Sequence, residues 1–109
     1  MSTTLDATEL ALAGAARQAS LVASGALSAR EMTELHLERI GRLGPQLNAF
    51  RVVLAEQALG QADAADARRP RGEAGVLNGV PVAIKDDTDV AGQATPFGTA
   101  GNGGLKGED

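Results

Sequence analysis

The sequence predicts an α/β composition, in which helices come first and a short strand follows. Two matched helix starts indicate the helices, because a capping box with a hydrophobic staple occurs at Asp6 and again at Ser28. A short apolar run from Val80 to Lys85 indicates the strand. With 109 residues, of which 43% are hydrophobic, the chain has the size of one small domain or of a piece of a larger one.

The first predicted helix begins after Asp6, which is followed three residues later by Glu9. Alanine-rich sequence continues from there, and alanine has the highest intrinsic helix propensity. Gly25 suits the left-handed position that follows many helices. These signals predict one helix over about residues 7–24, weakened slightly in its middle by Gly14.

The second predicted helix covers about residues 29–43 and begins at the capping box formed by Ser28 and Glu31. We expect it to end before the Gly44-Pro45 pair, because proline removes a helical hydrogen bond. Apolar residues recur at helical spacing and form one stripe along it: Met32, Leu35, Ile40 and Leu43.

A third helix is predicted over about residues 55–69, where alanines recur at helical spacing. A polar loop then leads to the Asn78-Gly79 turn signal, and the strand is predicted over about residues 80–85. Residues 92–109 are rich in glycine and predict a loop. No partner strand is evident, and an unpaired strand is unfavourable, so the sequence resembles a fragment of a larger domain.

The charge balance excludes several classes of partner. Ten Lys and Arg against fourteen Asp and Glu give a net charge of −4, which argues against nucleic acid and anionic membranes. The chain has no cysteine, so disulfide and thiol chemistry are absent. Its first ten residues lack the basic region and the long apolar stretch of a signal peptide or membrane span. We therefore expect a cytoplasmic location.

Neither a metal nor a cofactor is predicted. His36, the single histidine, lies within a predicted helix, and alone it supports neither a Ser-His-Asp triad nor a zinc site. The spacing of Asp87, Asp89 and Gly92 begins like a calcium loop, but Gly98 stands where that loop needs a glutamate. A Gly-Lys-Ser/Thr phosphate loop does not occur.

After these exclusions, Lys85 remains as the candidate catalytic residue. A lysine at the end of a buried strand can be kept neutral by desolvation and then serve as a general base for a serine hydroxyl. The alternative is a solvated lysine beside Asp86 and Asp87. Physical reasoning alone favours the solvated lysine.

A longer stretch resembles a known family. The segment "GVPVAIKDDTDVAG", with the pattern T-x-x-GT at Thr95, Gly98 and Thr99, is similar to the amidase signature family of amide hydrolases. The upstream segment "SGALSAREMTELHLERIGRLGPQLNAF" resembles the part of that family that precedes its lysine strand. The resemblance covers most of residues 9–101. Asp87, Pro96 and Phe97 depart from the usual pattern.

The resemblance implies a mixed-sheet α/β fold and hydrolysis of a small-molecule amide without a cofactor. The family uses a nucleophilic serine, a second serine in a cis peptide and a lysine, and Lys85 stands at the lysine position. Thr95, Gly98 and Thr99 are implied in substrate binding. The family's two serines lie downstream of its lysine. All four serines of this chain lie upstream of Lys85, at Ser2, Ser20, Ser24 and Ser28. The resemblance therefore implies an N-terminal fragment that is inactive alone.

Two alternatives remain open at this level. The amidotransferase subunit that amidates mischarged tRNA shares the same core and would need partner subunits. A non-catalytic helical module could instead bind a partner through the stripe of Met32, Leu35 and Ile40. A homodimer is compatible with the amidase interpretation, while nucleic acid and membrane partners are not expected.

Overall fold

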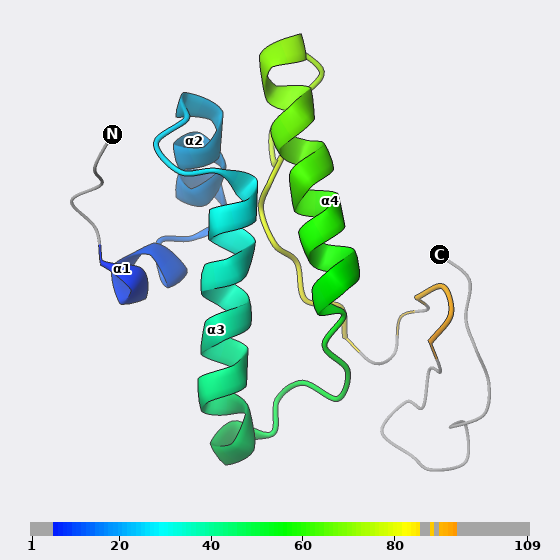
Figure 1. The fold of residues 1–109 in the computed structure, drawn as a ribbon. Coiled ribbons are helices and arrows are strands. Elements are labelled where there is room, and N and C mark those ends of the chain that lie inside the picture. Colours follow the sequence, from blue (N-terminus) through cyan, green and yellow to red (C-terminus); the bar gives the residue numbers. More distant parts are fainter. Residues whose placement is uncertain (1–5, 86–87, 89, 94–109) are drawn as a thin grey trace.

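The computed structural model describes residues 6–85, 88 and 90–93, and their regular structure is helical (Figure 1). The elements are α1 (Ala7–Ala11), α2 (Ala15–Ser24), α3 (Ala29–Leu47), α4 (Ala55–Arg68) and a short 3₁₀ helix, η1 (Arg69–Arg71). Helices α3 and α4 lie side by side and make the main contact, with α1 and α2 packed against α3. Among these elements, none combines the length and the apolar character needed to cross a membrane.

Residues 7–24 form two helices instead of the single one predicted. α1 ends at Ala11, and Gly14 takes a φ of 90° directly before α2. The break allows Leu10 to become buried, with 5% of its surface exposed. It also brings the side chain of Gln18 to the Leu10 carbonyl, which accepts a hydrogen bond from Gln18 Nε2 at 2.8 Å. One of the carbonyls left open at the end of α1 is thereby satisfied.

The capping box predicted at Ser28 is confirmed, and at Asp6 the predicted side-chain cap forms. The carboxylate of Asp6 accepts a hydrogen bond from the Glu9 N–H at 2.8 Å. At the start of α3, Ser28 Oγ accepts from the Glu31 N–H, and Glu31 Oε1 accepts from the Ser28 N–H, both at 3.0 Å. Each cap fixes where its helix begins, because it satisfies backbone donors that have no partner within the helix.

Helix α3 is longer than predicted, since it continues through Pro45 to Leu47. Pro45 removes the hydrogen bond to the Gly41 carbonyl, but both residues are exposed to solvent, so the loss costs little. Asn48 then takes a left-handed conformation with φ 50°, and its N–H donates to the Gly44 carbonyl at 2.7 Å. This αL cap ends the helix one turn later than the proline signal indicated.

The core lies where α2, α3 and α4 meet. Its members are Val22, Ala29, Met32, Ala62 and Ala65, with Leu27 packed against them. The alanines of α4 allow its backbone to approach α3 closely, and Met32 fills the space between the helices with no exposed surface. Burying such a side chain stabilises the fold by about 1.5–3 kcal/mol. Met32 therefore belongs to the core and is not available as a docking residue.

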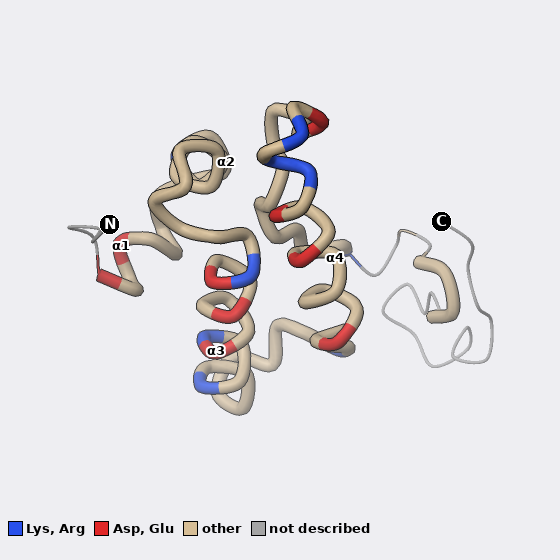
Figure 2. The backbone as a smooth tube through the Cα atoms, turned by 45° about the horizontal axis from the view of Figure 1, so that its top comes forward, with Lys and Arg blue, Asp and Glu red and all other residues tan. Residues whose placement is uncertain are grey.

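A carboxylate of α4 caps the start of α3. Asp66 accepts hydrogen bonds from the Ala29 N–H at 2.7 Å and from the Arg30 N–H at 3.1 Å. Negative charge is favoured there because the N-terminus of a helix carries partial positive charge. Arg30 also pairs with Asp63 of α4 at 2.7 Å, and Figure 2 shows that basic and acidic positions occur on both helices. Both partners are about half exposed, so the pair orients the helices more than it stabilises them.

The strand predicted over residues 80–85 is not formed. These residues have no regular secondary structure, and the described residues contain no β-strand. A strand depends on ladder hydrogen bonds to a neighbour, and the described part of the chain supplies no such neighbour. The α/β composition expected from the sequence is therefore not confirmed in this chain.

Candidate functional site

The segment that carries Lys85 begins in a tight turn after α4. The Val80 N–H donates to the Leu77 carbonyl at 3.1 Å, and Gly79 has a φ of 85°. A positive φ at the third of four turn residues, with a negative φ before it at Asn78, is typical of a type II turn. The Asn-Gly pair in the sequence correctly indicated a turn at this place.

The side chain of Asn78 binds the turn to α4 through both ends of its amide. Its Nδ2 donates to the Ala65 carbonyl at 3.0 Å. Its Oδ1 accepts from Nε of Arg68 at 3.2 Å. Because the amide is planar, these two bonds fix the orientation of the Asn78 side chain on the last turn of α4.

Gly79 packs directly against the core. A Cβ atom at this position would lie 2.8 Å from Cγ1 of Val22 and 2.9 Å from Cβ of Ala29, closer than side chains tolerate. Val22 and Ala29 are themselves buried, with 1% and 0% of their surfaces exposed. Only glycine therefore permits this close approach of the turn to α2 and α3.

Lys85 lies on the exposed part of the segment that follows this turn. Val82 and Ile84 are 76% and 53% exposed, so the prediction of a buried strand ending in a lysine is wrong for this chain. The Lys85 carbonyl accepts a hydrogen bond from the Thr88 N–H at 3.0 Å. The lysine thus stands at the end of a segment that is anchored at Asn78 and Gly79 and open to solvent afterwards.

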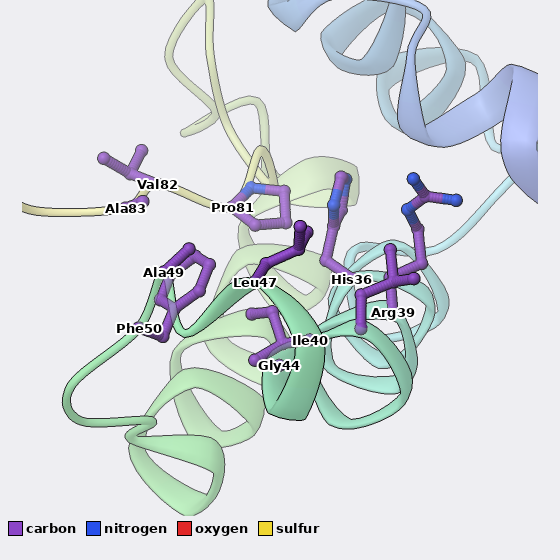
Figure 3. Close-up of a pocket in the computed structure, with 11 residues that line it drawn as sticks. His36, Arg39, Ile40, Gly44, Leu47, Ala49, Phe50, Pro81, Val82 and Ala83 are labelled. Atoms are coloured by element: carbon purple, nitrogen blue, oxygen red, sulfur yellow. The ribbon is translucent and has the colours of Figure 1, made fainter.

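A mostly apolar groove of about 390 Å³ runs beside this segment (Figure 3). One wall comes from the second half of α3, a second from the link between α3 and α4, and a third from the lysine segment. The lining residues are His36, Arg39, Ile40, Leu43, Gly44, Leu47, Ala49, Phe50, Pro81, Val82 and Ala83. The apolar stripe predicted on α3 therefore serves two places, since Met32 lies in the core and Ile40 and Leu43 line the groove.

The other residues expected at the site lie outside the described part of the chain. These are Thr95, Gly98 and Thr99, which were implied in substrate binding, and the acidic neighbours Asp86, Asp87 and Asp89. Within the described residues, no cluster of three or more histidine, cysteine or acidic side chains could hold a metal ion. Lys85 is accordingly the one predicted site residue that the structure places.

His36 has a role that the sequence did not indicate. Its Nε2 lies 3.2 Å from Nε2 of Gln18, which also donates to the Leu10 carbonyl. An amide nitrogen can only donate, so the imidazole must accept at Nε2 and carry its proton on Nδ1. Burial, and secondarily the positive charge of Arg39, lower the pKa of His36 below its ordinary value of 6.5. The neutral imidazole thereby links α3 to α2 and, through Gln18, to the end of α1.

Stability should depend on pH through His36. The pKa is lower in the folded than in the unfolded chain, so the stabilisation is complete above about pH 6.5 and is lost as the pH falls toward the folded pKa. We expect the free energy of unfolding in urea to fall more between pH 7.5 and about pH 5.5 in the parent chain than in a His36→Leu control. An NMR titration midpoint for His36 at or above 6.5 would contradict the assignment.

The sequence did not indicate the tertiary hydrogen bonds of two side chains, Gln18 and Asn78. Gln18 is buried, with 5% of its surface exposed, but it follows an arginine in a helix with an ordinary amphipathic pattern, and nothing marked it. Asn78 was marked as a turn residue, while its bonds to α4 depend on tertiary structure.

Comparisons with known proteins find relatives over most of this chain. The amidase family model matches residues 31–105, a range that includes Lys85. AmiB2 of Mycobacterium tuberculosis, an amidase by name, is 50% identical over 99 residues, which are 91% of this chain and 21% of AmiB2. A glutamyl-tRNA(Gln) amidotransferase subunit of Thioalkalivibrio sulfidiphilus is 49% identical over 84 residues, which are 77% of this chain and 17% of that protein.

A solved structure has the same fold over most of the chain. It comes from work on a vestigial protein complex and the origins of an s-triazine catabolic enzyme, and it superposes with a TM-score of 0.80 at 37% identity. The match covers 85% of this chain and 21% of that chain, so this chain spans about a fifth of the length of the proteins it resembles. The family match over residues 31–105 and the close relatives together show that the chain belongs to the amidase family.

Proposed function

We propose that this chain supplies the lysine-bearing part of an amide hydrolase of the Ser–cis-Ser–Lys type. The observation that carries the proposal is the amidase family match over residues 31–105, a range that includes Lys85. The amidase name of AmiB2 supports hydrolysis as the reaction.

In the proposed reaction Lys85 acts as the general base. Its Nζ takes the proton of the relay serine, which takes the proton of the nucleophilic serine as that oxygen attacks the amide carbonyl. The proton then passes to the leaving nitrogen as the C–N bond breaks, and water hydrolyses the resulting acyl-enzyme. This chain has no serine after Lys85, so the proposal requires that both serines come from outside these 109 residues.

The same proposal accounts for the missing strand. Residues 80–85 would become a strand of a mixed α/β sheet once neighbouring strands supply ladder hydrogen bonds. The exposed apolar side chains of Val82 and Ile84 would then be covered. Cytoplasmic location and a homodimer stay predictions on this view.

Amide transfer is the second candidate, because the glutamyl-tRNA(Gln) amidotransferase relative is nearly as similar to this chain as AmiB2 is. The two functions differ in what they require. A hydrolase releases ammonia from a small amide without ATP, whereas the transferase needs partner subunits and passes ammonia to its acceptor.

The complete protein should therefore release ammonia from a panel of small primary amides such as propionamide and benzamide, without ATP and without partner subunits. The 109-residue chain alone should release none above background, because it holds the base without a downstream serine to activate. Turnover by the isolated chain would contradict the proposed division of the site. Ammonia release from glutamine only with partner subunits present would favour the transferase.

A further inference from the structure

We infer that Asn78 is a positioning residue for Lys85, which it aligns by holding the start of the lysine segment against α4. This inference rests on the proposed function of Lys85 as the base. Asn78 lies seven residues before the lysine and binds α4 through both its amide nitrogen and its amide oxygen.

Asn78 and Gly79 hold the turn in different ways. Gly79 supplies the close approach to Val22 and Ala29, but it has no side chain with which to fix a direction. The bonds of Asn78 to the Ala65 carbonyl and to Arg68 supply that direction, since two hydrogen bonds to one planar amide define its orientation. The turn is thereby fixed to α2, α3 and α4 at once.

The residues between the turn and the lysine are held much less firmly. Residues 80–85 have no regular secondary structure, and Val82 and Ile84 are more than half exposed. Pro81 restricts its own φ and so carries the direction of the turn one residue further. Because the segment leaves directly from this turn, a rotation of the turn would shift the start of the strand that residues 80–85 form in the proposed enzyme. A displacement of about 1 Å at a catalytic group can cost about a hundredfold in rate.

The test uses the complete protein with three variants, Asn78→Ala, Ser28→Ala and Lys85→Ala. Ser28→Ala removes the side-chain cap of α3 but leaves both hydrogen bonds of Asn78 in place, so it is the matched control for lost stability. An alkyl fluorophosphonate is the probe, because it forms a bond to an activated serine oxygen with loss of fluoride and does not require the natural amide. The kcat and KM for ammonia release from any amide that is hydrolysed give a second readout.

Asn78→Ala should lower the labelling rate and kcat by about tenfold or more, with KM unchanged, while Ser28→Ala labels at the parental rate. Asn78→Asp keeps the acceptor for Arg68 and should recover part of the rate, and it replaces the alanine variant if that protein does not fold. Equal labelling rates for the Asn78 variants and Ser28→Ala would overturn the inference alone. An unlabelled parent, or parental labelling of Lys85→Ala, would overturn the proposed function and the inference with it.

Discussion

Lys85→Ala and Lys85→Arg should both abolish acylation in the complete protein, each lowering the rate by about 10²–10⁴. A general base must release its proton before it can accept another, and a guanidinium in a protein effectively never does. The arginine variant should consequently exceed the alanine variant by less than about tenfold. Burst kinetics of acyl-enzyme formation in the three proteins give the measurement, with circular dichroism as the check that each is folded.

The comparison between the alanine and arginine variants distinguishes a general base from a lysine that supplies only positive charge. A lysine that only balanced nearby carboxylates would be replaced well by arginine, which keeps the positive charge. Methylamine added to Lys85→Ala should restore part of the rate, because a free amine can occupy the space left by the side chain and accept the serine proton. Acylation by Lys85→Arg close to the parental rate would show that Lys85 is not the base.

The helix starts could be predicted from sequence because their causes are local. The capping box at Ser28 and Glu31 needs residues only three positions apart, and the structure forms both of its hydrogen bonds. The helix end at Pro45 was placed too early, since a proline near a solvent-exposed end costs less than one in a helix interior. The break between α1 and α2 falls at Gly14, which the sequence marked only as a weak point of one helix. The break is accompanied by the burial of Leu10 and Gln18, which depends on tertiary contacts.

The site was predictable only in part, for a similar reason. Resemblance to a family identified Lys85, and the family match includes it. The expected strand around it is absent from the described residues, because strand formation depends on partners elsewhere and not on the apolar run itself. The anchoring of the segment by Asn78 and Gly79 arises from contacts with α2, α3 and α4, which a pattern along the chain cannot contain.

Gly79→Ala should lower the free energy of unfolding by about 2–5 kcal/mol, more than alanine substitution of the other glycines that the structure describes. The left-handed backbone costs an alanine roughly 1–2 kcal/mol, and forcing a methyl group into a packed core adds about 1–3 kcal/mol. Gly72→Ala is the matched control, because Gly72 also has a positive φ, 71°, but nothing lies within 4 Å of the added Cβ. It should show the backbone cost alone in the same urea titration.

A double-mutant cycle identifies where the additional cost of Gly79→Ala arises. Val22→Ala removes the atom that would lie 2.8 Å from the new Cβ, so the cost of Gly79→Ala should be smaller in the Val22→Ala background. Contacting residues typically show a coupling energy of about 0.5–3 kcal/mol. Here the double variant should lose less stability than the sum of the two single losses. Equal losses for Gly79→Ala and Gly72→Ala, with no coupling to Val22, would mean that the turn does not press against the core. The anchor of the lysine segment would then reduce to the hydrogen bonds of Asn78.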